Sequence, residues 1–181
     1  VVVAAFVPRG IRFGSVALPK LKDSKKLTHF ARVAWTAYLR AHPKIIFSVS
    51  RVSPAVIDRV NISRSANIAA FRAYKKLISK TKKKHNSKRV FLDGGLFLGN
   101  GNGRILANTV IKGDEKIKAV SAASILAKVY RDKLMVVLAR KFPYYGFESH
   151  KGYGTKMHIR AIKKRGPIDG IHRKTFISGI I

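Results

Sequence analysis

Hydrophobic residues follow two patterns along this chain, and the first is a short continuous run. Runs rich in β-branched residues and bounded by Gly, Pro, Asn or Asp are typical of strands buried on both faces. Residues 1–7 form such a run, and after the Pro8-Arg9-Gly10 turn we expect residues 11–18 to continue the sheet. Residues 44–51, 89–95 and 105–111 are predicted to form the remaining strands.

The second pattern is apolar spacing of three and four residues, which predicts helices. A helix is expected from Ser24 until His42-Pro43 stops it, and a short one follows Ser53 because Pro54 suits the first helical position. Further helices are predicted over residues 61–79, 119–142 and 155–165, with a basic loop at 80–88 and a loop-like tail. In the first helix, the residues expected on the apolar face are Leu27, Phe30, Val33, Ala34, Ala37, Tyr38 and Ala41.

Composition adds a strongly basic surface to this mixed pattern. Thirty-eight Lys and Arg against eight Asp and Glu give a net charge of +30. Since Lys and Arg that neutralise phosphates release condensed counterions, the expected partner is nucleic acid, although a generally basic proteome is an alternative source of the charge. The 181 residues suit one main domain with a real hydrophobic core.

Two functional classes are excluded by residue content. The absence of cysteine removes disulfides, zinc–thiolate sites and thiol nucleophiles, and fits a reducing, cytoplasmic setting. The longest apolar stretches are too short to span a bilayer, so no membrane association is expected. Residues 1–7 also lack the features of a signal peptide and resemble a strand entered midway.

Because acidic residues are scarce, the position of each carboxylate is informative. Asp93 and Asp114 each follow a β-run and adjoin glycine, which would bring both to one sheet edge. Carboxylate oxygens suit Mg²⁺ or Mn²⁺, although Asp beside Gly is more often a plain turn. Asp58 and Asp132 are expected to make local ion pairs with neighbouring Arg and Lys. Asp169 and Glu148 do not stand out.

An ordered series of motifs then covers nearly the whole chain. In the first half it comprises Asp23-Ser24-Lys25-Lys26-Leu27, Arg51-Val52-Ser53, Ile57-Asp58, Asn61-Ile62 and Leu92-Asp93-Gly94. The second half contains Lys112-Gly113-Asp114, the helical Ser121-Ala122-Ala123-Ser124-Ile125-Leu126-Ala127-Lys128-Val129 with Arg131-Asp132, Tyr145-Gly146-Phe147, His150-Lys151-Gly152-Tyr153-Gly154-Thr155, Gly166-Pro167 and Ile171-His172-Arg173. This series resembles ribonuclease HII.

The resemblance implies an α/β fold with an RNase H-like mixed β-sheet flanked by helices. Residues 1–142 would form the catalytic domain and residues 143–181 a small helical substrate-binding extension. The implied activity is Mn²⁺- or Mg²⁺-dependent endonucleolytic cleavage of RNA in RNA–DNA hybrids and of single ribonucleotides embedded in duplex DNA. Such an enzyme would serve ribonucleotide excision repair and DNA replication, and we expect it to act as a monomer.

The same resemblance assigns roles to individual residues. Asp93 and Asp114 are implied to be two of four metal-binding carboxylates, and Tyr153 to pack on the sugar at the RNA–DNA junction. Tyr153 has a plain alternative as the anchor of its loop. The lysines expected near phosphates are Lys25, Lys26, Lys128 and Lys151, with Ser24 as a candidate helix cap and a solvated helix start as the alternative for residues 24–26. His150, His158 and His172 could serve in catalysis, but only His150 lies in a site motif, and most histidines are expected at the surface. The run Lys82-Lys83-Lys84-His85 is expected to be a solvated loop.

The chain departs from the family at its start. Family members carry an Asp-Glu pair on the first strand and then a Gly-Arg-Gly segment that reads the ribose 2′-hydroxyl, and neither occurs here. By the family pattern that strand lies centrally, so its absence would expose the edge of residues 1–7 and invite aggregation. With two of four ligands missing, divalent-ion binding should weaken. A paralogue that only binds nucleic acid is therefore the alternative, and an unrelated ribosomal-type basic protein would not account for the motif series.

Overall fold

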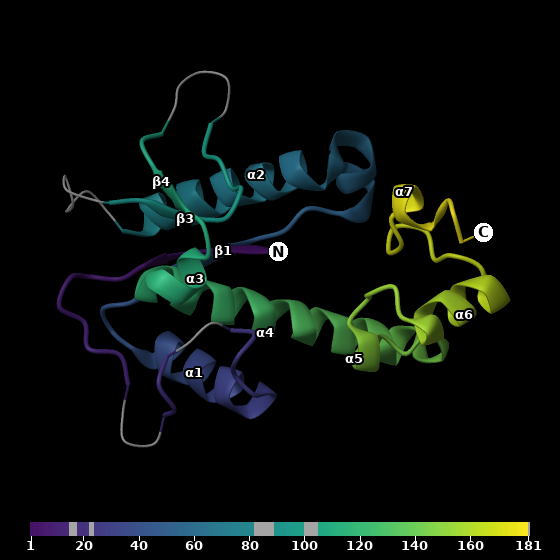
Figure 1. Ribbon diagram of the computed structural model, residues 1–181, viewed down its shortest axis with the longest axis horizontal. Coiled ribbons are helices and arrows are strands. Elements are labelled where there is room, and N and C mark those ends of the chain that lie inside the picture. The colour runs from purple at the N-terminus through teal and green to yellow at the C-terminus, as the bar shows by residue number, and fades with distance from the viewer. Residues whose placement is uncertain (15–17, 22–23, 82–88, 100–104, 181) are drawn as a thin grey trace. The chain divides into compact units, whose positions relative to one another are not determined.

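The computed structural model describes residues 1–14, 18–21, 24–81, 89–99 and 105–180, which divide into two compact units (Figure 1). Unit 1 comprises Val1–Arg51 and Ala66–Val129, and unit 2 comprises Val52–Ser65 and Tyr130–Ile181. The expected boundary at residue 142 differs from this division, because unit 2 also takes the first part of one long helix and the second part of another.

Unit 1 contains all the strands that the described residues form. Its elements are β1 (Val2–Phe6), α1 (His29–Ala41), β2 (Ile46–Ser50), the second part of α2 (Pro54–Lys80), β3 (Phe91–Asp93), β4 (Asn108–Val110), α3 (Gly113–Lys116) and the first half of α4 (Lys118–Lys141). Strand β1 pairs antiparallel with β2, whereas β3 pairs parallel with β4. The mixed α/β class is confirmed, but these strands form two separate two-stranded sheets.

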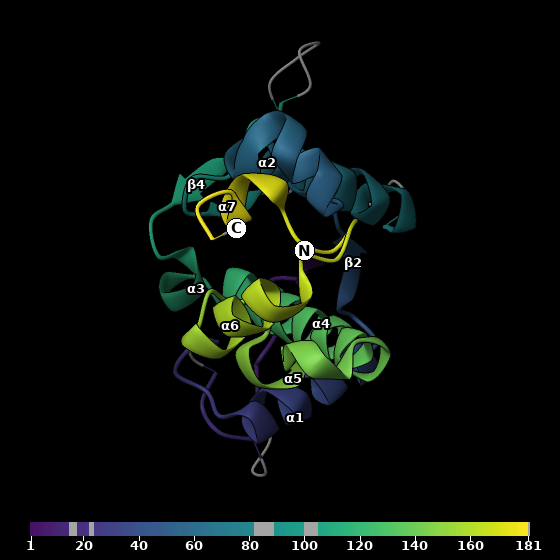
Figure 2. The same cartoon turned by 90° about the vertical axis from the view of Figure 1, so that its right-hand side faces the viewer.

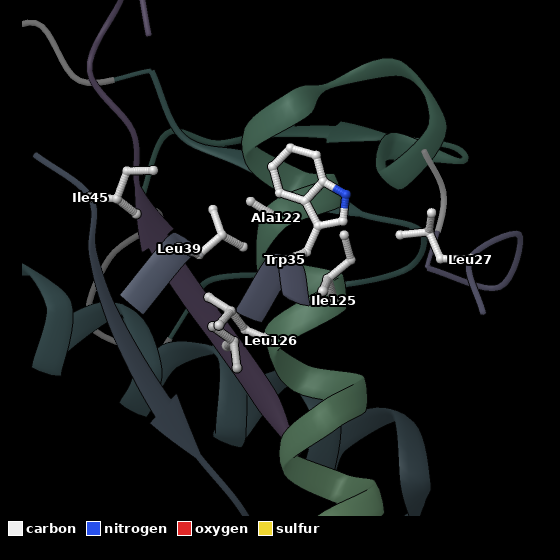
Figure 3. Packing of buried hydrophobic residues seen from close by; sticks show 8 residues of the cluster. Leu27, Trp35, Leu39, Ile45, Ala122, Ile125 and Leu126 are labelled. Carbon is white, nitrogen blue, oxygen red and sulfur yellow. The ribbon is translucent and has the colours of Figure 1, made fainter. Parts of the chain in front are cut away.

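The main core of unit 1 lies between α1, α4 and β1 (Figure 3). Trp35 and Leu39 of α1 are fully buried against Ala122 and Ile125 of α4. The Trp35 indole also donates a hydrogen bond from Nε1 to the Pro19 carbonyl at 3.1 Å, so burial leaves its polar atom satisfied. Small residues such as Ala122 allow α4 to approach the other elements closely.

A second cluster in unit 1 joins β3 to α2. Ala70 of α2 packs with Leu92 of β3 and Leu98. Beside it lies a cavity of about 710 Å³ lined mainly by apolar side chains, and both β1 and β3 contribute to its wall. Since β1 pairs only with β2 and β3 only with β4 among the described residues, each sheet presents a free edge to this cavity.

Unit 2 is helical apart from its loops. It contains the start of α2, the second half of α4, η1 (Pro143–Tyr145), α5 (Phe147–His150), α6 (Lys156–Arg165) and α7 (Lys174–Ile177). Figure 2 shows α5 and α6 beside the C-terminal half of α4, where Ala139, Phe147 and Ile162 share one core cluster. No helix in the described part of the chain is long and apolar enough to cross a membrane.

Several predicted elements are confirmed. Helix α4 occupies residues 118–141 and ends before Pro143, and α6 begins after Thr155, whose hydroxyl accepts a hydrogen bond from the His158 backbone N–H. The predicted pair of helices after Ser53 is also present. Within α2, these two helices meet at a kink at Asn61, where the backbone leaves helical geometry (φ 65°, ψ 171°).

Other predictions were wrong. Residues 11–14 and Leu18 form no strand, and residues 15–17 lie outside the described residues. Helix α1 begins at His29 with Thr28 as its cap, while the Ser24 hydroxyl lies 3.0 Å from that of Ser124. The tail contains the short helix α7, and the basic run 82–85 lies outside the described residues.

The apolar face predicted for the first helix was also partly wrong. Phe30 is 84% exposed and Val33 is exposed as well, whereas Trp35 and Leu39 are fully buried. Residues 30–39 are apolar almost all round the helix, so spacing alone did not identify the side that meets the core.

Candidate metal and nucleic acid site

Asp93 is positioned by the end of strand β3. The strand stops at this residue, and Gly94 takes a left-handed conformation (φ 56°) that turns the chain away. One carboxylate oxygen of Asp93, Oδ1, accepts a hydrogen bond of 2.9 Å from the Gly113 backbone N–H. This bond fixes the side chain against the segment that leads into α3.

Asp114 follows Gly113 directly and belongs to α3, not to the end of a strand as expected. Its side chain is buried, and the turn into α3 passes through Lys112 in the left-handed region (φ 55°). Because the residue before Asp114 hydrogen-bonds the Asp93 carboxylate, the two predicted metal ligands are neighbours in space despite their separation in sequence.

The donor chemistry at this position fits a hard divalent cation only in part. Two carboxylates supply the oxygen ligands that Mg²⁺ and Mn²⁺ prefer, and Mg²⁺ commonly keeps several waters besides one or two carboxylates. The adjacent Glu115 forms an ion pair with Lys26 at 3.4 Å. Within the described residues, no third His, Asp or Glu joins Asp93 and Asp114 in a group that could hold a metal ion.

The candidate phosphate-binding lysines of unit 1 lie on different elements. Lys25 and Lys26 are exposed just before α1, and the ion pair of Lys26 with Glu115 connects that segment to α3. Lys128 is half-buried on α4. All three belong to the same unit as Asp93 and Asp114.

Tyr153 lies in unit 2, in the loop between α5 and α6. Its side chain is 59% exposed, and the Arg131 guanidinium lies 5.0 Å from the ring centroid. Lys151 and Gly152 both take positive φ (50° and 77°), which turns the loop sharply before Tyr153. Lys151 Nζ donates to the Glu148 carbonyl. The Tyr153 ring is thus presented to solvent from a tight turn.

His150 is buried, unlike Tyr153, and serves the same loop from within. Its Nε2 lies 2.6 Å from the Tyr145 carbonyl oxygen, and its Nδ1 accepts a hydrogen bond of 3.1 Å from the Gly152 N–H. Since both ring nitrogens contact backbone, His150 has no free nitrogen for a substrate.

Sequence reasoning missed several residues around this loop. Most histidines were expected at the surface, with His158 and His172 as possible catalytic residues outside the site motif, but both are buried in a cluster with His150. Arg131 was considered only as an ion-pair partner. Asp58, expected to pair locally, instead accepts hydrogen bonds from the backbone N–H groups of Lys174 and Thr175, more than a hundred positions along the chain. The sequence offered one signal, because all three histidines lie within or near the motifs of the second half.

Comparisons with known proteins agree on one family. The family model described as Ribonuclease HII matches residues 1–178. A Ribonuclease HII of Fusobacterium nucleatum is 42% identical over 164 residues, which cover 91% of this chain and 74% of that protein. One from Chloroherpeton thalassium is 39% identical over 171 residues, covering 94% and 76% respectively.

Solved structures show the same fold at lower identity. The crystal structure of ribonuclease H2 from Pyrococcus horikoshii matches with a TM-score of 0.55 at 23% identity, covering 86% of this chain and 76% of that one. The structure of a PCNA:RNase HII complex from Archaeoglobus fulgidus gives a TM-score of 0.59 at 21% identity, covering 88% and 80%.

Proposed function

The chain belongs to the ribonuclease HII family, and from that membership we propose that it is an endoribonuclease that hydrolyses RNA within RNA–DNA hybrids. The proposal extends to single ribonucleotides embedded in duplex DNA, and so to a role in ribonucleotide excision during repair and replication. One observation carries it. The Gly113 backbone N–H donates a hydrogen bond to the Asp93 carboxylate, and Gly113 directly precedes Asp114.

Asp93 and Asp114 would hold Mg²⁺ or Mn²⁺, and the bound ion would supply Lewis-acid stabilisation of the phosphodiester and activation of water. The contribution of the chain itself is to fix the Asp93 carboxylate of β3, through a backbone hydrogen bond, against the segment that leads to Asp114 of α3. Lys25, Lys26, Lys128 and Lys151 would bind substrate phosphates, and the exposed Tyr153 ring would pack on a sugar. His150 would act by holding the Tyr153 loop.

A second candidate function is binding without cleavage, because the described residues bring no third His, Asp or Glu to Asp93 and Asp114. Two carboxylates bind a divalent ion more weakly than four, because hard cations are held by ligand charge and number. The cavity between the free edges of β1 and β3 would accommodate the strand on which family members carry their Asp-Glu pair. Full activity would then require carboxylates delivered to this cavity.

A cleavage assay separates the two functions. Duplex DNA with one ribonucleotide, incubated with the chain and Mn²⁺ or Mg²⁺, should be cut at that ribonucleotide only when metal is present. Tight binding with no cleavage under either metal would reject the nuclease and establish the binding protein.

The Asp93→Asn variant tests the metal site itself. Asparagine keeps an oxygen that accepts the Gly113 N–H, so the fold should survive while the ligand charge is lost. We expect cleavage to fall at least about a hundredfold, since metal-ion stabilisation amounts to several kcal/mol, with hybrid affinity changed less than about twofold. Asp169→Asn, at an exposed loop position, is the matched control. Retained cleavage in Asp93→Asn would remove this residue from the site.

A further inference from the structure

Three histidines of unit 2 form a buried cluster that the proposed reaction does not use. His150, His158 and His172 are only 7%, 6% and 8% exposed. The His150 and His158 rings stack with their centroids 4.2 Å apart, and His158 Nε2 lies 3.1 Å from His172 Nε2. Phe147, itself 2% exposed, contacts all three rings.

The backbone partners assign one tautomer to each ring. His150 must carry its proton on Nε2, because Nε2 faces the Tyr145 carbonyl and Nδ1 accepts from the Gly152 N–H. His172 Nδ1 accepts from the Ile168 N–H at 2.8 Å, so its proton is on Nε2. His158 Nδ1 lies 2.9 Å from the Tyr153 carbonyl and donates to it, which leaves Nε2 to accept the proton of His172.

In these tautomers every ring nitrogen of the cluster has one partner of the correct kind. A second proton on any ring would break this arrangement, because each accepting nitrogen already faces an N–H group. On His158 it would oppose the His172 Nε2–H, on His172 the Ile168 N–H, and on His150 the Gly152 N–H. The cluster is therefore complete only when all three rings are neutral.

Two of these bonds hold the loop that carries Tyr153. The Gly152 N–H is bound by His150, and the Tyr153 carbonyl accepts from both His158 Nδ1 and the Thr155 N–H, at 2.9 and 2.8 Å. The Tyr153 side chain is itself exposed, and the Arg131 guanidinium lies over its ring. The direction of the ring therefore depends on backbone bonds that the histidines make.

The surroundings favour the neutral rings. Burial, followed by the neighbouring histidines, lowers the pKa of His172, and burial likewise lowers the pKa of His158 against the raising effect of its bond to the Tyr153 carbonyl. The pKa of Arg173, next to His172, is lowered by burial and by Arg131. Charged groups lie on every element around the cluster: Arg131, the buried Asp132, Lys133, Arg140 and Lys141 on α4, Glu148 and Lys151 near α5, Lys156, Arg160, Lys163, Lys164 and Arg165 on α6, Asp169, Arg173 and Lys174 around His172, and Asp58 on α2, which accepts hydrogen bonds from α7.

We propose that His150, His158 and His172 are positioning residues whose neutral, hydrogen-bonded cluster fixes the 151–155 loop, so that acidification releases Tyr153 and weakens substrate binding. The positioning of the loop stands on the contacts alone, whereas the consequence for binding rests on the proposed function. The expected loss of affinity on acidification is distinctive, because protonated histidines would ordinarily strengthen the attraction of a basic protein for phosphate.

Nitrogen-15 NMR of the imidazoles in the complete chain tests the cluster without any substrate. At pH 7.5 we expect the Nε2–H tautomer for His150 and His172 and the Nδ1–H tautomer for His158. On lowering the pH through the range below 6.5, amide exchange at Gly152 and Tyr153 should accelerate before global unfolding. A charged ring at pH 7.5, or a different tautomer at His158 or His172, would overturn the proposal.

Binding is measured by fluorescence anisotropy with an RNA–DNA hybrid, without metal, between pH 7.5 and 5.5. We expect the affinity for the hybrid to fall by about tenfold, or about 1.4 kcal/mol, as the cluster takes up protons. Affinity that instead rises steadily on acidification would refute the link between cluster and substrate. Absence of binding at every pH would reject the proposed function and leave the tautomers to decide the positioning claim.

Two substitutions of one histidine provide a matched comparison. In His158→Asn the side-chain amide can still donate to the Tyr153 carbonyl, whereas in His158→Gln the longer side chain reaches toward His172 and that donor is lost. We expect His158→Asn to bind within about twofold of the parent at pH 7.5 and His158→Gln about tenfold more weakly. The exposed His29→Asn in unit 1 should change neither affinity nor its pH dependence. Equal affinity of the two His158 variants would contradict the role of the Tyr153 bond.

Discussion

At the scale of single residues, partners far away in sequence decide what the carboxylates do. The sequence distinguishes Asp93, at a strand end beside glycine, from Asp58, in a helix beside Arg59, but it does not show the partner of either carboxylate. Asp93 meets the Gly113 N–H at the start of α3, whereas Asp58 meets the first turn of α7 with both oxygens. Asp93 is thereby held near Asp114, a second carboxylate, whereas Asp58 caps helix α7.

The Asp58 cap yields a prediction for α7. Its Oδ2 accepts from the Lys174 N–H, and its Oδ1 accepts from the Thr175 N–H and hydroxyl, at 2.8, 3.1 and 2.7 Å. Replacing it in Asp58→Ala should accelerate hydrogen exchange at these two amides and lower the thermal midpoint of the chain, because a four-residue helix without its cap is not stable alone. Asp169→Ala, which removes only an exposed ion pair with Lys174, is the control and should leave both amides protected.

The pH dependence of this cap follows from the Asp58 pKa, which the Thr175 hydroxyl bond lowers from 3.8. A carboxyl group with a lowered folded pKa stabilises the fold fully above the unfolded value and loses that contribution as pH falls through the folded value. The difference between the parent and Asp58→Ala should therefore be full at neutral pH and shrink below about pH 4. A difference that persists at pH 2 would argue against the cap.

At the scale of elements, the bend inside α2 is the clearest local feature. Asn61 has φ 65° and ψ 171°, a backbone region that is strained for residues other than glycine, and its Oδ1 accepts from the Arg64 N–H at 3.0 Å. The side chain thus caps the second part of α2. Asn61→Ala should destabilise the chain by about 1–2 kcal/mol through loss of this cap, whereas Asn61→Gly should cost only a few tenths. Urea unfolding followed by circular dichroism measures both, and equal losses would mean that the bend carries no strain.

Filling the cavity beside β1 and β3 gives a second test at this scale. Ala123 of α4 lines the cavity, whereas its neighbour Ala122 is fully buried in the main core. Ala123→Leu should raise the free energy of unfolding by about 1 kcal/mol, because the added carbons enter open apolar space. Ala122→Leu should lower it by about 1–3 kcal/mol through overpacking. Parallel urea titrations of the two variants measure both changes. A loss of stability in Ala123→Leu would show that Ala123 does not line open space, and a gain in Ala122→Leu would show that Ala122 is not tightly packed.

The elements also show what the sequence could predict. Helices α4 and α6 depend on local spacing, Pro143 and the Thr155 cap, and all these signals lie within a few residues of the helix. The buried side of α1 was not predictable in this way, since apolar residues surround the helix and packing against α4 and β1 buries Trp35 while Phe30 stays exposed. Residues 11–14 and Leu18 were expected in a strand and form none, because a strand needs a partner edge that local sequence does not supply.

In the candidate site, too, the sequence predicted residues from local motifs but not the contacts between distant segments. Asp93 and Asp114 were predicted from their motifs, and the Gly113 bond that brings them together requires β3 and α3 to meet in three dimensions. The burial of the three histidines was not foreseen, because their partners are carbonyl and N–H groups of residues 145, 152, 153 and 168. Since every residue has a backbone carbonyl and all but proline have a backbone N–H, the sequence does not show which of these groups a side chain will contact.

At the scale of the whole molecule, a net charge of +30 makes electrostatics the first expected contribution to nucleic-acid affinity. Phosphate contacts release counterions, so the logarithm of the association constant should fall linearly with the logarithm of salt concentration. Six or more contacts would lower the affinity by at least about a thousandfold between about 50 and about 200 mM salt. A strong slope alone, however, would follow from any strongly basic protein.

Single-lysine variants decide whether the charge acts at the proposed surface. Lys25→Ala should reduce the salt slope by about one, as loss of one phosphate contact requires, and so should Lys151→Asn, in which asparagine tolerates the left-handed backbone of position 151. Lys44→Ala, at an exposed lysine outside the candidate set, should leave the slope unchanged. If all three variants reduced the slope equally, binding would depend on total charge, and the assignment of Lys25 and Lys151 to the substrate path would fail. If the salt slope fell by about one in Lys25→Ala and in Lys151→Asn but not in Lys44→Ala, Lys25 and Lys151 would each contact a phosphate of the bound substrate.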